Sequence, residues 1–167
     1  MYDSDSKYEY PGTNVLINHF NIKDPQKLSL KEAGITLNRL FRLENSPIIG
    51  NFDLNHLKKI HEYVFSEIYP FARKLRDENI MKGSFRFAEF RYIESSANDL
   101  FKKLKSEKTL ANLPKEELPE RAAFYMSEIN VLHPFREGNG RTTREFIINS
   151  DSSPTSRSEV SRWGMNR

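Results

Sequence analysis

The stretch from residue 133 to residue 144 combines side chains that are suited to phosphate chemistry. It reads His-Pro-Phe-Arg-Glu-Gly-Asn-Gly-Arg-Thr-Thr-Arg. His133 has an ordinary pKa of about 6.5, so it can accept a proton at neutral pH. Glu137 offers a carboxylate, which is the kind of ligand that Mg²⁺ takes together with substrate phosphates. Arg141 and Arg144 lie three residues apart, so on a helix both can point towards one polyphosphate.

The glycines of this stretch indicate how the backbone takes part. Gly138 and Gly140 carry no Cβ atom, so successive N–H groups can converge on an anion. A helix is expected to start around Arg141, and its first N–H groups and its dipole favour a phosphate at the same place. Pro134 ends the preceding helix and leaves His133 free at its end. Such a site fits phosphate-ester transfer, in which positioning and charge neutralisation supply most of the catalysis.

Helical periodicity in almost the whole chain predicts the elements that hold this site. Asp53 is placed as the N-cap of a second helix, which Tyr69-Pro70-Phe71 should end. The last helix, from about Arg141, carries Phe146 and Ile147. The four earlier helices are indicated by apolar stripes at Ala33, Leu37, Leu40 and Phe41; Leu54, Leu57, Ile60, Val64, Phe65 and Ile68; Ile93, Ala97, Leu100, Phe101 and Leu104; and Ala122, Met126 and Ile129, the fourth helix running from near Pro119 towards His133.

Two segments interrupt the helical pattern. Residues 74–90 alternate aromatic and polar side chains around Lys82-Gly83-Ser84, which predicts a hairpin or an extended flap. Residues 149–167 are rich in serine and lack an apolar stripe, which predicts a polar, disordered tail. We therefore expect an all-α, mainly helical domain over residues 1–148, with a small β-hairpin flap at about residues 80–90, before the third helix.

Composition excludes several classes of protein. The chain of 167 residues has no cysteine, which rules out disulfides, thiolate metal sites and cysteine nucleophiles. No apolar run approaches the roughly 20 residues needed to span a bilayer, and no secretory signal is visible, so we expect a cytoplasmic protein. The net charge of +3 comes from mixed charges, which does not favour direct nucleic-acid binding. His56 and His61 are five residues apart, the wrong spacing for two zinc ligands on one helical face, and His61 is interpreted as structural.

The sequence resembles the Fic family of nucleotidyltransferases. Residues 133–144 match the family signature H-P-F-x-[D/E]-G-N-G-R-x-x-R at every specified position. The similarity covers roughly residues 8–147 and includes Tyr10-Pro11-Gly12-Thr13-Asn14-Val15-Leu16, Gly50-Asn51-Phe52-Asp53-Leu54, Ile60-His61 and Tyr69-Pro70-Phe71-Ala72, in the family's order.

The resemblance implies a role for each residue of the site. His133 would deprotonate a hydroxyl of a target protein, and Glu137 would hold Mg²⁺ across the α- and β-phosphates of ATP. Arg141 would stabilise the departing pyrophosphate, and Arg144 would reach the γ-phosphate. The flap would hold the target by strand addition. The implied nucleotide-binding set is Lys82, Gly83, Gly138, Asn139, Gly140, Arg141 and Arg144.

The implied activity is transfer of AMP from ATP to a Ser, Thr or Tyr hydroxyl. Phosphotransferring relatives carry lysine in the place of Gly140, so the glycine favours AMP transfer. A small antitoxin protein is implied as a separate inhibitor, which would make this chain the bacterial toxin of such a pair. Thr155 and Glu159 have the spacing of the family's inhibitory helix, but the residues around them indicate a chance match.

Two departures from the family keep a second interpretation open. Arg73 stands where the family usually has glycine, so it is expected to strain a turn or crowd the cleft. The similarity also stops near Ile147, where the family continues with further helices. The alternative is therefore a degenerate, C-terminally truncated Fic fold that serves as a nucleotide-binding or interaction module.

Overall fold

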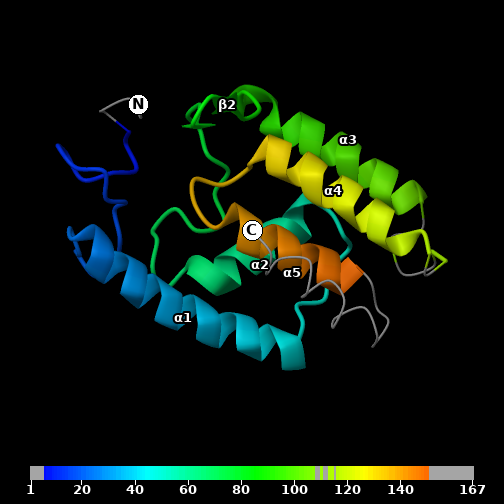
Figure 1. The fold of residues 1–167 in the computed structure, drawn as a ribbon, viewed down its shortest axis with the longest axis horizontal. Coiled ribbons are helices and arrows are strands. Elements are labelled where there is room, and N and C mark those ends of the chain that lie inside the picture. Colours follow the sequence, from blue (N-terminus) through cyan, green and yellow to red (C-terminus); the bar gives the residue numbers. More distant parts are fainter. Residues whose placement is uncertain (1–5, 108–109, 111–112, 115, 151–167) are drawn as a thin grey trace.

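The computed structural model describes residues 6–107, 110, 113–114 and 116–150. In this part of the chain, five α-helices and one two-stranded hairpin form the fold (Figure 1). The elements are α1 (Pro25–Asn45), α2 (Leu54–Phe65), β1 (Met81–Lys82), β2 (Phe85–Arg86), a 3-10 turn η1 (Phe90–Tyr92), α3 (Ile93–Ser106), α4 (Leu118–Leu132) and α5 (Asn139–Ser150).

Helix α2 lies at the centre and packs against α1, α3 and α5, while α4 packs against α3 and α5 (Figure 1). As the sequence predicts, Asp53 caps α2: its Oδ1 accepts a hydrogen bond from the His56 N–H at 2.8 Å. The predicted stripe of α2 is buried, including Ile60 and Val64 at 0% exposure. The helix ends at Phe65, so Ile68 of that stripe is buried in the following turn rather than in the helix.

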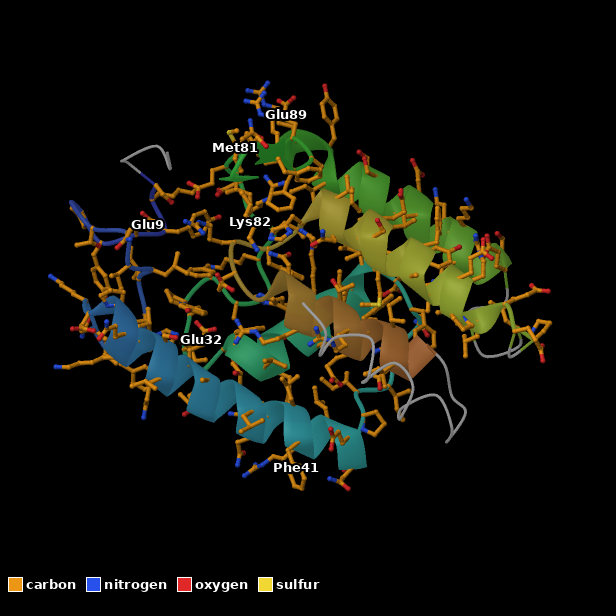
Figure 2. All side chains as sticks on the ribbon, viewed as in Figure 1. Glu9, Glu32, Phe41, Met81, Lys82 and Glu89 are labelled. Carbon is orange, nitrogen blue, oxygen red and sulfur yellow. The ribbon has the colours of Figure 1, made fainter. Side chains whose placement is uncertain are left out.

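Helix α1 exists, but the stripe that predicts it does not face the core. Leu37 and Phe41 are 71% and 64% exposed. The buried residues of α1 are Leu28, Thr36 and Leu43, on a different face. Figure 2 shows Glu32 on the side of α1 that faces the other helices and Phe41 on the opposite side. The prediction failed because the inward face of α1 carries polar groups that have specific partners in the site.

The predicted flap is a short antiparallel hairpin that precedes α3. Met81 pairs with Arg86 and Lys82 with Phe85, so Gly83 and Ser84 form a two-residue turn. Gly83 has φ +60°, a conformation that such tight turns require and that glycine adopts without strain. The hairpin lies near the start of α3 and the end of α4 (Figure 1). The mainly helical fold class and its flap are therefore confirmed.

Helix α5 continues past residue 148, where the expected domain ends. Asn149 and Ser150 belong to α5, and the rest of the expected tail, residues 151–167, lies outside the described residues, as does the Thr155–Glu159 match. No helix in the described ranges is long and apolar enough to cross a membrane.

Arg73 does occupy a strained turn. Its φ is +72°, in the left-handed region that favours glycine. However, its side chain is directed to Glu62, at 2.7 Å, and to Asn55, at 3.2 Å, and both contacts are exposed. The expectation that Arg73 crowds the cleft is therefore wrong, because these surface partners hold the guanidinium.

Candidate active site

His133 lies at the point where α4 ends. It is the C-cap of α4 with φ +45°, and its Nδ1 lies 3.2 Å from the carbonyl oxygen of Asn130. A carbonyl oxygen can only accept a hydrogen bond, so Nδ1 carries the proton and Nε2 carries the lone pair. The ring stacks on Phe87 from the end of the flap, with centroids 3.8 Å apart.

The electrostatic surroundings of His133 keep it neutral. Burial, together with the positive charges of Arg76 and Lys82, lowers its pKa to about 4, against a weaker opposing effect of the bond to Asn130. At neutral pH the imidazole is therefore unprotonated. It is suited to accept a proton at Nε2.

Residues 133–138, which we call the motif loop, are closed by hydrogen bonds within the motif. The amide of Asn139 accepts from the Phe135 N–H at 2.8 Å and donates to the Phe135 carbonyl at 2.7 Å. The hydroxyl of Thr142 donates to the Gly138 carbonyl at 2.9 Å. Because its amide is satisfied in this way, Asn139 has its backbone N–H, rather than its side chain, available for an anion.

Gly138 is required at the start of α5 for two reasons. Its φ is +79°, and a Cβ atom built on it would lie 2.3 Å from the ring of Phe65. A Cβ built on Gly140 would instead meet nothing within 4 Å. The first N–H groups of α5 have no acceptor within the helix, so this end of α5 can bind an anion beside open space.

His61 is a buried structural residue, as the sequence predicts, and the structure adds that it supports the motif loop. Its Nδ1 accepts the Arg73 N–H at 2.9 Å, so Nε2 carries the proton and donates to the Glu137 carbonyl at 2.9 Å. The ring also stacks on the buried Phe135, with centroids 3.9 Å apart. Burial, and secondarily the charge of Arg141, lowers the pKa of His61 to about 4. The signals in the sequence were its place beside the apolar stripe of α2 and the Ile60-His61 segment of the family resemblance.

Glu137 and Arg141 form the charged centre of the site. Oε1 of Glu137 accepts from the Gly138 N–H at 2.8 Å and lies 3.3 Å from Nη2 of Arg141. The Glu137 side chain is 40% exposed, so a cation can approach its carboxylate. No group of three or more potential metal-ligating His, Asp or Glu side chains occurs among the described residues, so a cation here would need phosphate or water oxygens as further ligands. This donor set fits Mg²⁺ bound with a nucleotide.

Helix α1 adds two residues to the site that the sequence did not indicate. Oε1 of Glu32 lies 2.5 Å from Nη2 of Arg141, and the hydroxyl of Thr36 lies 3.3 Å from Nη1. The other oxygen of Glu32 accepts a hydrogen bond from the hydroxyl of Tyr69. Burial and this bond raise the pKa of Tyr69. Arg141 thus lies between two carboxylates, over the ring of Phe65.

The remaining predicted residues lie at two places. Arg144 is one turn along α5 from Arg141, and its buried Nε has no hydrogen-bond partner in the described part of the chain. Lys82 and Gly83 lie on the hairpin, and the Lys82 charge acts on His133. Figure 2 shows Lys82 on the flap and Glu32 on α1, with the motif loop between these two elements. The structure therefore groups seven of the predicted residues around the start of α5 and leaves two on the flap.

A neutral histidine, a carboxylate and two arginines at a helix N-terminus have the composition of a phosphate-ester transfer site. Residues 51–149 match the Fic/DOC family, and the chain belongs to this family.

The relatives agree with this membership. Over 144 residues the chain is 44% identical to protein adenylyltransferase VbhT of Bartonella schoenbuchensis. The matched region covers 86% of this chain but only 30% of VbhT. It is 38% identical over 140 residues to the probable protein adenylyltransferase Fic of Escherichia coli, covering 84% of this chain and 69% of that protein.

Solved structures show the same fold. BepC of Bartonella tribocorum with bound AMPPNP has a TM-score of 0.81 at 28% identity, covering 89% of this chain and 78% of BepC. A Fic domain of Bartonella quintana with bound ADP has a TM-score of 0.77 at 27% identity, covering 86% of this chain and 74% of that one.

Proposed function

We propose that this chain transfers AMP from ATP to a Ser, Thr or Tyr hydroxyl of a target protein, with His133 as the base. The observation that carries the proposal is the unprotonated Nε2 of a neutral His133, one short loop away from an anion-binding helix N-terminus. The relatives named as protein adenylyltransferases, and the solved Fic domains with AMPPNP or ADP, support ATP as the substrate.

The proposed reaction is a single displacement at the α-phosphorus. Nε2 of His133 takes the proton of the target hydroxyl while the hydroxyl oxygen forms a bond to the α-phosphorus. The bond from the α-phosphorus to the bridging α,β-oxygen breaks, and pyrophosphate leaves with its negative charge beside Arg141. Arg144 binds the γ-phosphate end. Preorganised donors of this kind stabilise charge that develops in the transition state.

The remaining site residues take defined places in this proposal. Gly138, Asn139 and Gly140 line the phosphate nest, Asn139 through its backbone N–H. Glu137 holds Mg²⁺, which bound with the phosphates would neutralise charge on the nucleotide. Lys82 and Gly83 complete the proposed nucleotide-binding set from the flap, where an extended target segment also adds as a strand next to His133.

Location, regulation and domain extent belong to the same proposal. We assign the transferase domain to residues 1–148 and its reaction to the bacterial cytoplasm, where ATP is available. The inhibitor that the family resemblance implies is a separate small antitoxin protein.

Labelling with two isotopic forms of ATP tests the proposal. The purified chain is incubated with Mg²⁺ and either α-³²P- or γ-³²P-labelled ATP in a bacterial lysate, beside His133→Ala. A protein band labelled only from the α position, and absent with His133→Ala, is the expected result. Label from the γ position would show phosphate transfer instead. No label at all, including self-labelling, would favour a nucleotide-binding or interaction module.

A further inference from the structure

Arg76 is a buried arginine that the proposed chemistry does not use. It is 2% exposed and lies between the turn after α2 and the flap. Its guanidinium donates four hydrogen bonds among the described residues, and all four acceptors are backbone carbonyl oxygens. Burial lowers its pKa to about 10, so the group remains positively charged at neutral pH. A buried cation is costly unless its donors are used, and here most of them are.

Two of these bonds hold the end of α4 at the base. Nε donates to the His133 carbonyl at 2.7 Å, and Nη2 donates to the Leu132 carbonyl at 3.1 Å. The backbone N–H of Arg76 donates to the Pro134 carbonyl at 2.9 Å. The carbonyls of Leu132, the last residue of α4, and of the two residues that follow it are therefore all satisfied by one residue, whose charge also complements the helix dipole.

The other two bonds hold the flap. Nη1 donates to the Glu78 carbonyl at 2.6 Å, and Nη2 also donates to the Ala88 carbonyl. These two residues flank residues 79–87, which contain the hairpin of the flap. Arg76 thus holds both ends of the flap with the same planar group that holds His133. The stacking of Phe87 on His133 lies within this bonded unit.

We propose that Arg76 is a positioning residue that fixes the flap relative to His133. The inference rests on the proposed function in one respect, that the flap presents the target hydroxyl to Nε2. No hydrogen bond of Arg76 goes to residues 137–144, so its main effect is on the placement of the target, and nucleotide binding changes only through Lys82 and Gly83 of the flap. The planar guanidinium with its three nitrogen atoms is needed, because a lysine side chain has one nitrogen and cannot reach the carbonyls of the flap and those at the end of α4 together.

Arg76→Lys tests this role, because it keeps the positive charge and replaces the guanidinium by a single ammonium nitrogen. The matched control is Arg121→Lys. Arg121 lies near the other end of α4, and its guanidinium is held by an ion pair to Glu107 at 2.5 Å rather than by backbone carbonyls. Hydrogen exchange by mass spectrometry follows the flap, titration with AMPPNP and Mg²⁺ gives the nucleotide Kd, and α-³²P labelling of lysate proteins gives the transfer rate.

For Arg76→Lys we expect faster exchange in residues 79–87, a nucleotide Kd within about twofold of the original, and transfer slowed about 10- to 100-fold. Arg121→Lys should change none of the three. Unchanged exchange and transfer, or a Kd that weakens in proportion to the loss of transfer, would overturn the proposal. If the original chain labels no protein, the proposed function fails, while flap exchange and Kd still decide the role of Arg76.

A measurement on the unaltered chain covers the case in which Arg76→Lys does not fold. NMR detects scalar coupling through a hydrogen bond between Nε of Arg76 and the carbonyl carbon of His133. A resolved coupling, with slow solvent exchange of the Nε proton, is expected. An Nε proton that exchanges rapidly with solvent would contradict the bonded unit.

Discussion

His61 donates a hydrogen bond from Nε2 to the backbone carbonyl of Glu137 at 2.9 Å, which ties the middle of α2 to the motif loop. We expect His61→Leu to lower the free energy of unfolding by about 2–4 kcal/mol, because it leaves the Glu137 carbonyl and the Arg73 N–H unpaired in a buried place. Chemical denaturation measures this loss.

His56→Leu is the control, because His56 is as buried as His61 but makes no hydrogen bond to the described residues of the site. Its Nε2 lies 2.8 Å from the Ile48 carbonyl oxygen instead. Only the His61 variant should also bind AMPPNP more weakly, and equal binding by both would contradict the link to the loop.

The two histidines at the loop make stability depend on pH. His61 and His133 each have a folded-state pKa of about 4, against 6.5 as the ordinary value. Above pH 6.5 neither state binds the proton, so stability does not change through these groups. Between pH 6.5 and 4 the unfolded chain binds protons that the folded one excludes, so stability falls by up to about 1.4 kcal/mol per pH unit for a fully buried histidine. Denaturation midpoints at pH 7, 6 and 5 measure the fall.

His133→Gln provides the control for the pH dependence. It removes one of the two groups, so the slope below pH 6.5 should become shallower. The charged groups that act on the rings are Arg76 and Lys82 for His133 and Arg141 for His61. Stability that is constant or rises from pH 7 to pH 5 would contradict the lowered pKa values.

The two glycines of the motif should respond in opposite ways to alanine. Gly138→Ala forces a left-handed residue and a clash with Phe65, so we expect a loss of about 2–4 kcal/mol in the free energy of unfolding. Gly140→Ala meets no protein atom and should stabilise α5 by up to about 1 kcal/mol. Its methyl group enters the open space at the start of α5, so AMPPNP affinity should fall about tenfold. Thermal unfolding and nucleotide titration separate the effects, and a Gly140→Ala chain with full affinity would place the nucleotide elsewhere.

Arg73→Gly should stabilise the chain by about 1 kcal/mol, because it relieves a left-handed conformation. The hydrogen bond from its N–H to His61 is kept, and the ion pair to Glu62 that is lost is exposed and weak. Arg73→Ala loses the same ion pair without relieving the backbone, so its melting temperature should stay at or below that of the original chain. A Gly variant no more stable than the Ala variant would show that the turn carries no strain.

The elements that the sequence predicts well are those defined by local pattern. The α2 stripe, the Asp53 cap and the hairpin turn at Gly83 each depend on neighbouring residues, whose spacing is visible in the chain. The motif residues are likewise contiguous, so most of the candidate site could be proposed from them alone.

The contacts that the sequence does not predict join residues that are far apart in the chain. Arg76 and His133 are 57 positions apart, and Glu32 and Arg141 are 109 apart. The inward face of α1 carries Glu32 and Thr36, while its exposed face carries Leu37 and Phe41. Apolar periodicity therefore selects the wrong face, because the partners of α1 in the site are a cation and a hydroxyl and not only aliphatic side chains.

Glu32 forms an ion pair with Arg141. Its carboxylate lies 2.5 Å from Nη2 of Arg141, the group that we assign to the leaving pyrophosphate. Glu32→Gln removes one negative charge from a site proposed for a polyanion, so we expect AMPPNP to bind about three- to tenfold more tightly. The pKa of Tyr69 should also move down towards its ordinary value, because Glu32 is one of the causes of its rise. Nucleotide titration and ultraviolet titration of tyrosine measure the two effects.

Glu67→Gln is the matched control for Glu32→Gln. Glu67 pairs with Arg39 of α1 at 3.1 Å, on a more exposed part of the same helix interface and with no bond to the motif. It should change neither nucleotide affinity nor the titration of Tyr69. If Glu32→Gln weakens nucleotide binding instead, the carboxylate serves to hold Arg141 in its binding position, and the ion pair must persist when nucleotide is bound. Tighter binding would show that the phosphates and Glu32 compete for the same guanidinium.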